Sequence, residues 1–394
     1  MWKLMENIID KDDINSLIHF LQNSDRFTNG PNVVQFEEEW SNWLGVNRSV
    51  MVNSGASANF TSIAIVKELF GIGEVIVPSL GWSSDVSSIV QLGMTPVFVD
   101  IDPNTLGLNP TSLKNAISDQ TKAVVIVHAL GFNAITEEVK NILTDRKIFV
   151  IEDCCESHGA LLDIDKNIKI GTFGNLSLFS FYFGHHITTI EGGMVCTKDE
   201  KLYQLAKMFR SHGMTREAST DIKSEFEKNY PDLNPLFTFA LAGFNFRSTE
   251  INAVLGLSQI KKLDLNIAKR TENLKTWLDN LDGNFFQTSF NDVGSSNFAL
   301  PLILKDKNKN LFKKICYQLN SMNVEYRLGT AGGGNLSRQP FLKKYEHKIT
   351  DNQNTVNHVH EFGLYVGNGS HVGSKRIKEV VFQLNKVAIE VGAK

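Results

Sequence analysis

Short, continuously apolar segments alternate with helix-like stretches through the first half of this 394-residue chain. The apolar segments, each bounded by turn residues, lie at 75–78, 97–100, 123–128, 148–152 and 176–181. The helix-like stretches lie at 12–24, 33–44, 58–70 and 134–145. Strands that are apolar on both faces are typical of a parallel sheet covered by helices on both sides. The sequence therefore predicts an α/β fold built on a mostly parallel sheet.

The pattern of apolar and polar residues changes after about residue 260. There we expect a strand at 296–304, a helix at 308–321, a strand at 323–327 and a terminal helix at 374–392. We therefore predict two domains. A large cofactor-binding domain spans 1–260, including the N-terminal helical segment, and a smaller C-terminal α/β domain spans 261–394. The polar stretch 213–236 is expected to be a loop or lid.

Composition excludes several classes of function. The net charge of -3 gives no basic footprint for nucleic acid. The sequence has no apolar run of about 18 residues, so no membrane-spanning helix is expected. The first residues lack the apolar core of a signal peptide, and a cytoplasmic protein is therefore expected. The four cysteines, Cys154, Cys155, Cys196 and Cys316, form no C-x-x-C pair. No metal site is predicted from them.

Ligands of such sheets bind beyond the carboxyl ends of the strands, and three polar segments occupy such positions. Gly55, Ala56 and Ser57 open the helix at 58–70 and could bind a phosphate, although a simple helix cap is the alternative. Asp153 follows the strand at 148–151 and could hold a protonated ring nitrogen, or could cap the next element. The third segment, 180–193, contains a histidine doublet in a polar loop bounded by glycines.

Taken in order, these segments resemble the nucleotide-sugar aminotransferase branch of the fold-type-I enzymes that use pyridoxal 5'-phosphate (PLP). The resemblance covers nearly the whole chain, and its motifs lie at 28–31, 55–57, 78–82, 97–102, 152–153, 180–181, 191–193 and 243–250. It implies a fold-type-I aminotransferase-like α/β fold, in which a large domain with a mostly parallel seven-stranded sheet is joined to a smaller C-terminal domain. It also implies a homodimer with shared active sites.

One position departs from the pattern of most of that family. A lysine usually stands six residues before the glutamate of the Glu-Gly-Gly motif, but counting back from Glu191 gives His185. The nearest downstream lysine, Lys198, lies beyond the glycine pair. This departure resembles one sub-branch, the sugar 3-dehydratases, whose motif carries Gly-His-His followed by Thr-Ile-Glu-Gly-Gly.

The resemblance implies a PLP and pyridoxamine 5'-phosphate (PMP) enzyme that holds its cofactor without a covalent bond. Its expected reaction removes the 3-hydroxyl of a nucleotide-linked 4-keto-6-deoxyhexose, and L-glutamate restores PMP from PLP. His185 is the expected base, because an imidazole with a reference pKa near 6.5 suits proton transfer. The sugar class points to surface-glycan synthesis, such as colitose in an O-antigen.

Other roles are implied position by position. The expected cofactor contacts are Gly55, Ala56, Ser57 and Ser180 at the phosphate, Trp82 on the ring, Asp153 at its nitrogen, Glu156 near its phenolic oxygen, and Asn245 from a neighbouring subunit. Trp82 could instead be core, and Asn245 could instead stabilise a turn. His186, His212 and Arg327 are candidate substrate contacts, with structural or surface roles as their alternatives.

Two dehydratase types share the histidine. One uses glutamate and PMP alone and acts on GDP-4-keto-6-deoxymannose, which we favour. The other carries an iron–sulfur cluster and acts on a CDP-sugar, and such a cluster needs about four thiolates within reach. An ordinary sugar aminotransferase and an inactive sugar-nucleotide binder are further alternatives. The missing lysine argues against the first, and the retained pocket residues argue against the second.

Overall fold

The computed structural model describes residues 1–392. Its largest sheet has the order β1-β9-β8-β5-β4-β2-β3-β12. The strands are β1 (Arg48–Val52), β2 (Glu74–Pro78), β3 (Thr95–Val99), β4 (Thr121–Val127), β5 (Phe149–Asp153), β8 (Leu176–Ser180), β9 (Gly193–Thr197) and β12 (Lys348–Ile349). Only the pairings of β9 are antiparallel. The predicted mostly parallel sheet is confirmed, with β12 from the C-terminal part as an eighth strand.

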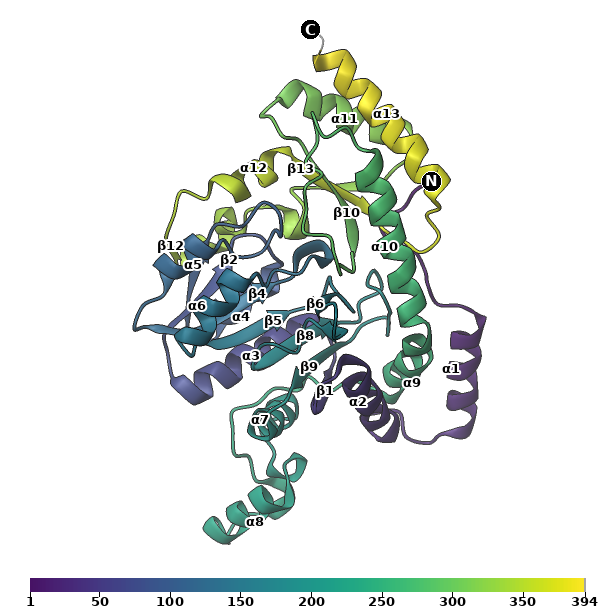
Figure 1. Cartoon of the computed structure of the whole chain (residues 1–394). Helices are drawn as coiled ribbons and strands as arrows, with labels where there is room; N and C mark the ends of the chain where they lie inside the picture. The colour runs from purple at the N-terminus through teal and green to yellow at the C-terminus, as the bar shows by residue number, and fades with distance from the viewer. Residues whose placement is uncertain (393–394) are drawn as a thin grey trace.

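Helices cover both faces of this sheet (Figure 1). One face carries α3 (Gly55–Phe70), α4 (Ser83–Gln91) and α7 (Glu200–Arg210), and the other carries α2 (Pro31–Leu44), α5 (Pro110–Ala116) and α6 (Glu137–Asp145). Alternate residues of β4 enter different cores: Val125 packs with α3, whereas Val124 packs with α5 and α6. Burial on both faces explains why these strands are continuously apolar.

The C-terminal part forms a second sheet of the order β10-β13-β11. Its strands are β10 (Ala299–Ile303), β11 (Tyr326–Leu328) and β13 (Gly363–Gly367). It is packed by α10 (Leu263–Asn280), α11 (Lys309–Ser321), α12 (Asn354–Phe362) and α13 (Ser374–Gly392). We retain the domain division at 260/261 as a proposal. Strand β12 belongs to the C-terminal part of the chain but pairs with β3 in the large sheet. Residues 393–394 lie outside the described part. The N-terminal α1 (Lys11–Asn23) packs on α9 (Glu250–Gln259).

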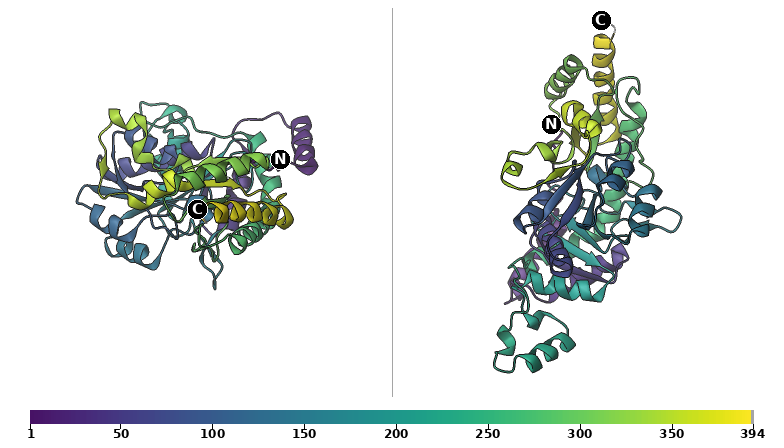
Figure 2. Two further views of the ribbon diagram at one scale, coloured as in Figure 1. Left: turned by 90° about the horizontal axis from the view of Figure 1, so that it is seen from above. Right: turned by 90° about the vertical axis from the view of Figure 1, so that its left-hand side faces the viewer.

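The polar stretch predicted as a loop contains a helix. Residues 214–239, which we call the arm, hold α8 (Thr220–Asn229) between two short 3-10 turns. The arm projects from the body in two perpendicular views (Figures 1 and 2). No residue of α8 is buried, and only Ile222 and Phe226 of its otherwise polar sequence lie at helical spacing, which is a weak signal for a helix.

A buried ion pair fixes the strand that leads into the candidate site. Arg210, the last residue of α7, donates from Nη1 to Oε1 of Glu37 at 2.6 Å, and that oxygen also accepts from the Met51 N–H at 2.7 Å. The Arg210 and Glu37 side chains are 4% and 10% exposed. Burial raises the pKa of Glu37, and the Arg210 charge opposes that rise. The pair therefore ties α2, β1 and α7 together.

We expect Arg210→Met to lower the free energy of unfolding by about 3–5 kcal/mol, because it leaves the Glu37 carboxyl buried without its cation. The matched control is Arg48→Met. It breaks the ion pair of Arg48 with Glu200, whose side chains are 51% and 58% exposed, and should cost less than about 1 kcal/mol. Denaturant titration of both variants measures the difference. Equal losses of unfolding free energy in the two variants would show that the buried pair stabilises the fold no more than the exposed pair does.

Candidate active site

The helix α3 begins at the edge of the sheet where the parallel strands end. Its N-cap Ser54 accepts the Ser57 N–H through its side chain, whereas the N–H groups of Gly55 and Ala56 have no acceptor within the described residues. A Cβ on Gly55 would lie 2.7 Å from the Ser180 Cβ at the end of β8. Glycine is therefore required, and the helix end and the Ser180 hydroxyl form one corner whose free N–H and O–H groups suit an anion.

Asp153 ends β5 beside this corner. Its Oδ1 accepts from the Cys155 N–H at 2.9 Å and its Oδ2 from Asn59 Nδ2 at 3.3 Å. The side chain is 6% exposed and lines the same cavity as Trp82. Trp82 is 51% exposed, so its indole is available to a ligand rather than committed to the core. This observation supports the predicted ring contact over the core alternative.

The loop between β8 and β9 carries His185 and closes back on itself. The Phe181 N–H donates to the Gly192 carbonyl at 2.9 Å, and the Thr189 N–H donates to the Phe181 carbonyl at 3.0 Å. Arg270 of α10 reaches the loop from below and donates to the His185 carbonyl at 3.2 Å. The His185 backbone is thereby held in place, and its ring lines the cavity.

The pocket moves the pKa of His185 away from the reference value of a free imidazole. Burial, followed by the Arg270 charge, lowers the pKa of His185 to about 3, although Asp153 partly opposes the fall. The side chain is 9% exposed and its Nδ1 has no hydrogen-bond partner within the described residues. The imidazole is therefore neutral at physiological pH, which is the form in which a base must start.

Glu156 lies across the cavity. Its Oε2 accepts the Leu130 N–H at 2.7 Å. Burial raises the pKa of Glu156 to about 7, against the effect of that hydrogen bond, and the Asp153 charge adds to the rise. Arg327 and Tyr365 complete this side, with 3.4 Å between Nη1 and the phenol oxygen. A carboxyl with this pKa can donate a proton or accept one near neutral pH.

Most of the predicted site residues meet in this one cavity of about 250 Å³. Its wall includes Gly55, Ala56, Trp82, Asp153, Glu156, Ser180, His185 and Arg327. Four predicted residues are not on the wall: Ser57, His186, His212 and Asn245. Ser57 lies in the first turn of α3 and donates its N–H to the N-cap Ser54, and His186 is buried with Nε2 3.2 Å from the Ser296 carbonyl. His212 is half-buried at the base of the arm, and Asn245 is exposed nearby.

The comparisons with known proteins agree with this geometry. The model of the DegT/DnrJ/EryC1/StrS aminotransferase family matches residues 7–385. The chain belongs to this family.

Two relatives within the family are similar along almost their whole length. The GDP-4-keto-6-deoxy-D-mannose 3-dehydratase of Escherichia coli O55:H7 is 34% identical over 89% of this chain and 91% of that protein. The enzyme of the same name from Yersinia pseudotuberculosis is 33% identical over 96% of both. The solved structure of GDP-4-keto-6-deoxymannose-3-dehydratase with a trapped PLP-glutamate geminal diamine has a TM-score of 0.88 and 32% identity, and covers 98% of this chain and 100% of that one.

Several residues of the cavity wall were not expected from the sequence. They are Met5, Asp85, Tyr182, Phe298 and Tyr365, together with Arg270 behind His185. Met5 and Tyr365 arrive from distant parts of the chain and have no local signal. Asp85 did have a local signal in the sequence, because it stands in the first turn of a helix that begins beside Trp82.

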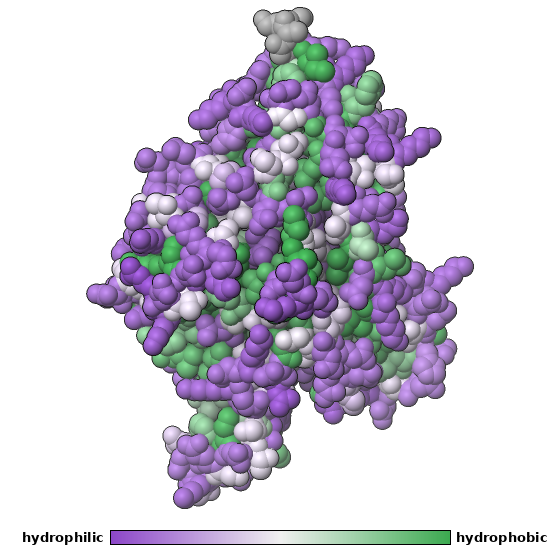
Figure 3. Space-filling model, in the orientation of Figure 1, coloured by the Kyte–Doolittle hydropathy of each residue, from purple (hydrophilic) through white to green (hydrophobic). Residues whose placement is uncertain are grey.

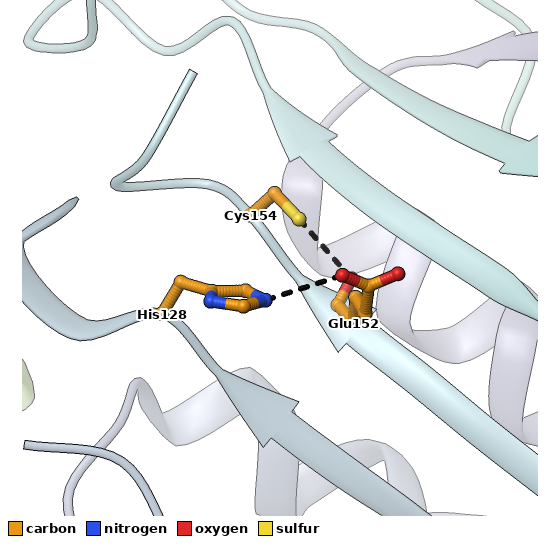
Figure 4. Close-up of side chains that lie close together, drawn as sticks. All are labelled: His128, Glu152 and Cys154. Atoms are coloured by element: carbon orange, nitrogen blue, oxygen red, sulfur yellow. Dashed lines mark hydrogen bonds and ion pairs between the residues drawn. The ribbon is translucent and has the colours of Figure 1, made fainter. Parts of the chain in front are cut away.

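Behind the cavity, His128, Glu152 and Cys154 place their ligand atoms within 4.8 Å of one another (Figure 4). Their geometry differs from that of a metal centre. His128 Nδ1 accepts the Ala134 N–H at 3.1 Å, so Nε2 carries the proton and lies 3.4 Å from Glu152. Glu152 also accepts three backbone N–H groups, from residues 171, 173 and 174. The trio therefore braces β4 and β5.

The pH dependence of stability tests the environment of Glu156. Its pKa rises from 4.5 to about 7 on folding, so the contribution of Glu156 to stability falls as pH rises through that window, whereas the lowered pKa of His185 contributes in the opposite direction and is common to wild type and variants. One pKa unit corresponds to about 1.4 kcal/mol, and partial exposure reduces the effect, so we expect a fall of about 2–3 kcal/mol. Glu156→Gln should remove this fall in denaturant titrations, whereas the exposed Glu138→Gln should retain it. An unchanged slope in Glu156→Gln would contradict the assignment.

Proposed function

We propose that this protein is a PMP-dependent sugar 3-dehydratase. It would remove the 3-hydroxyl of a nucleotide-linked 4-keto-6-deoxyhexose, most directly GDP-4-keto-6-deoxymannose, and regenerate PMP with L-glutamate. The observation that carries the proposal is His185, which occupies the position of the family's lysine and faces the cavity. No lysine elsewhere takes over this position, because within the described chain none of the cavity-wall residues is a lysine.

The cavity fits a pyridoxamine phosphate. The N–H groups at the start of α3 and the Ser180 hydroxyl suit a phosphate, and the Asp153 carboxylate suits a protonated ring nitrogen. Trp82 offers a flat apolar face at the opening. When bound, the protonated pyridine ring supplies an electron sink that makes a neighbouring C–H acidic. The protein supplies the orientation and the proton acceptor.

His185 has two consequences for the reaction. A neutral imidazole can accept a proton at its unprotonated nitrogen, and it cannot bind a cofactor aldehyde as a lysine amine does. The cofactor amine therefore stays free for a sugar carbonyl. Arg270 fixes the His185 backbone and Tyr182 accepts its N–H, so the ring approaches the substrate from a set direction. Glu156 can hold or release a proton across the cavity.

Arg327 supports an anionic substrate. It is exposed at the cavity rim, and its guanidinium can bind a diphosphate or the carboxylate of glutamate through two parallel hydrogen bonds. GDP is favoured because the relatives that cover most of this chain act on a GDP-sugar by name. A dTDP-sugar dehydratase from Saccharopolyspora spinosa is 27% identical.

The cysteines favour the glutamate-dependent type over the iron–sulfur type. Cys154 and Cys196 are buried in the large domain, Cys155 lies at the cavity wall, and Cys316 lies on α11 of the small domain. Within residues 1–392, no three cysteines bring their sulfur atoms within 4.8 Å of one another. A four-thiolate cluster would need them together.

We also propose a homodimer with shared active sites, in which Asn245 reaches the phosphate of the other subunit. Asn245 is exposed and lies outside the cavity of its own chain. The arm beside it exposes Leu236, Phe237 and Phe239 at 54–60%, and apolar surface is visible on it (Figure 3). Such a surface is typical of a protein interface. None of the helices in the described chain is long and apolar enough to cross a membrane.

The first test is cofactor chemistry. Purified protein mixed with PLP and L-glutamate should produce PMP and 2-oxoglutarate, followed by absorbance, and borohydride should leave no cofactor attached to the chain. His185→Lys is the matched control, because its amine should become covalently labelled under the same conditions. Covalent labelling of the wild-type chain would instead support an aminotransferase.

The second test is turnover. With GDP-4-keto-6-deoxymannose the PMP-loaded protein should release ammonia, and His185→Asn should lower this rate about 100-fold or more through loss of the base. Transfer of the amine to the sugar without ammonia release would contradict the dehydratase.

Shared active sites predict complementation. His185→Asn and Asn245→Ala are each expected to be nearly inactive. After subunit exchange in an equal mixture, about a quarter of the wild-type activity should return, because half of the dimers are mixed and each has one intact site. Activity measured before and after exchange gives the result. No recovery, with exchange demonstrated, would show that Asn245 serves its own chain.

A further inference from the structure

The cavity contains a second buried carboxyl that the proposed reaction leaves without a role. Asp85 lies in the first turn of α4, is 1% exposed, and lines the cavity next to Asp153. Two carboxyl groups that share a dry pocket cannot both ionise without a large cost. Their arrangement therefore has to be explained by hydrogen bonding or by a proton.

The hydrogen bonds of Asp85 are unequal. Its Oδ2 accepts the Trp82 N–H at 2.9 Å. Its Oδ1 is buried and has no hydrogen-bond donor within residues 1–392, although the Asn59 amide, which donates to Asp153, also acts to lower the pKa of Asp85. An ionised carboxylate would leave this oxygen unpaired, which is costly in a buried site. Asp85 and Asp153 line the same cavity wall, and their side chains form a hydrogen bond once one of the two groups is protonated.

The surroundings of Asp153 indicate which carboxyl is the acceptor. Both oxygens of Asp153 already receive a donor, one from the Cys155 N–H and one from Asn59. These contacts favour its ionised form. The titratable groups that face Asp85 are Asp153 and the Cys155 thiol, neither of which supplies a positive charge. The N-terminus of α4 favours an anion at Asp85, but a partial helix charge is a small effect beside burial against a second carboxylate.

We propose that Asp85 and Asp153 hold one proton between them, with Asp85 as a positioning residue whose carboxylic acid donates a hydrogen bond to the Asp153 carboxylate. The pair then carries a single negative charge, and the unpaired oxygen of Asp85 is satisfied. Burial, and next the Asp153 charge, raise the pKa of Asp85 well above its usual range, in agreement with this arrangement. The alternative is an ordinary helix-capping acid that is ionised.

The consequence for function rests on the proposed cofactor. A donated hydrogen bond fixes the Asp153 carboxylate in the orientation that meets a ring nitrogen. Asp85 would thus support the electron sink without touching it.

The protonation state can be read on the full-length protein without cofactor. The measurement is made at a pH above the Glu156 pKa of about 7, so that Glu156 is ionised. Infrared difference spectra should then still show the carbonyl stretch of a protonated carboxylic acid. Asp85→Asn should abolish the band, and Ser88→Ala, a change of a buried hydroxyl in the same helix, should leave it. Absence of the band in the wild-type chain would overturn the proposal.

Cofactor affinity gives the second readout. Asp85→Ala removes the donor and should weaken PMP binding about tenfold or more, because the lost hydrogen bond is made to a charged group. Asp85→Asn can donate to Asp153 through its amide and still accept the Trp82 N–H, so it should restore most of that loss. Binding weakened equally in both variants would show that the charge of Asp85 matters, and would overturn the proposal.

These outcomes separate the two proposals. If the wild-type chain binds no PMP, the proposed function fails, while the infrared band still decides whether the carboxyl pair holds a proton. If PMP binds and the band is absent, the function stands and the role of Asp85 is wrong.

Discussion

The carboxyl ends of β8, β5 and β2 lie at one edge of the sheet because these strands run parallel, and the candidate site depends on that constraint. Each strand delivers one part of the site at this edge: Ser180 ends β8, Asp153 ends β5, and Trp82 follows β2. The same geometry brings the N-terminus of α3 to the edge. The phosphate corner, the carboxylate and the aromatic face are thus consequences of one topology, and only small adjustments of loops are needed to bring them together.

Exclusion of water gives these groups their chemical character. Burial favours the neutral form of every ionisable group, so it lowers the pKa of His185 and raises that of Glu156. The two shifts move in opposite directions: near neutral pH the His185 imidazole is uncharged, and the Glu156 carboxyl is only partly ionised. The charges that persist are placed where a partner or a ligand compensates them: Arg270 against backbone carbonyls, and Arg327 at the open rim.

Much of the fold could be predicted because its signals are local. Apolar runs such as 123–128 correspond to buried strands, and the cavity residues that follow strands were predicted from their place in the pattern. The stretch 213–236 was predicted as a loop or lid, and α8 within it was missed because its ten residues carry only two apolar side chains, Ile222 and Phe226. The low pKa of His185 could not be predicted, since it arises first from burial and then from the charge of Arg270, which lies 85 residues away in sequence and meets the histidine only after folding. Met5 and Tyr365 reach the wall for the same reason.

The low pKa of His185 has a physical consequence for its role as a base. The Arg270 guanidinium disfavours a second cation at His185, and the Asp153 charge only partly opposes that effect. An anion that enters within about 4–6 Å acts in the opposite direction and strengthens the base. A phosphate at the start of α3 and an acidic substrate at Arg327 would both bring negative charge into the cavity. The histidine would then gain basicity as the site fills, and a lysine at the same position would be charged or covalently engaged beforehand.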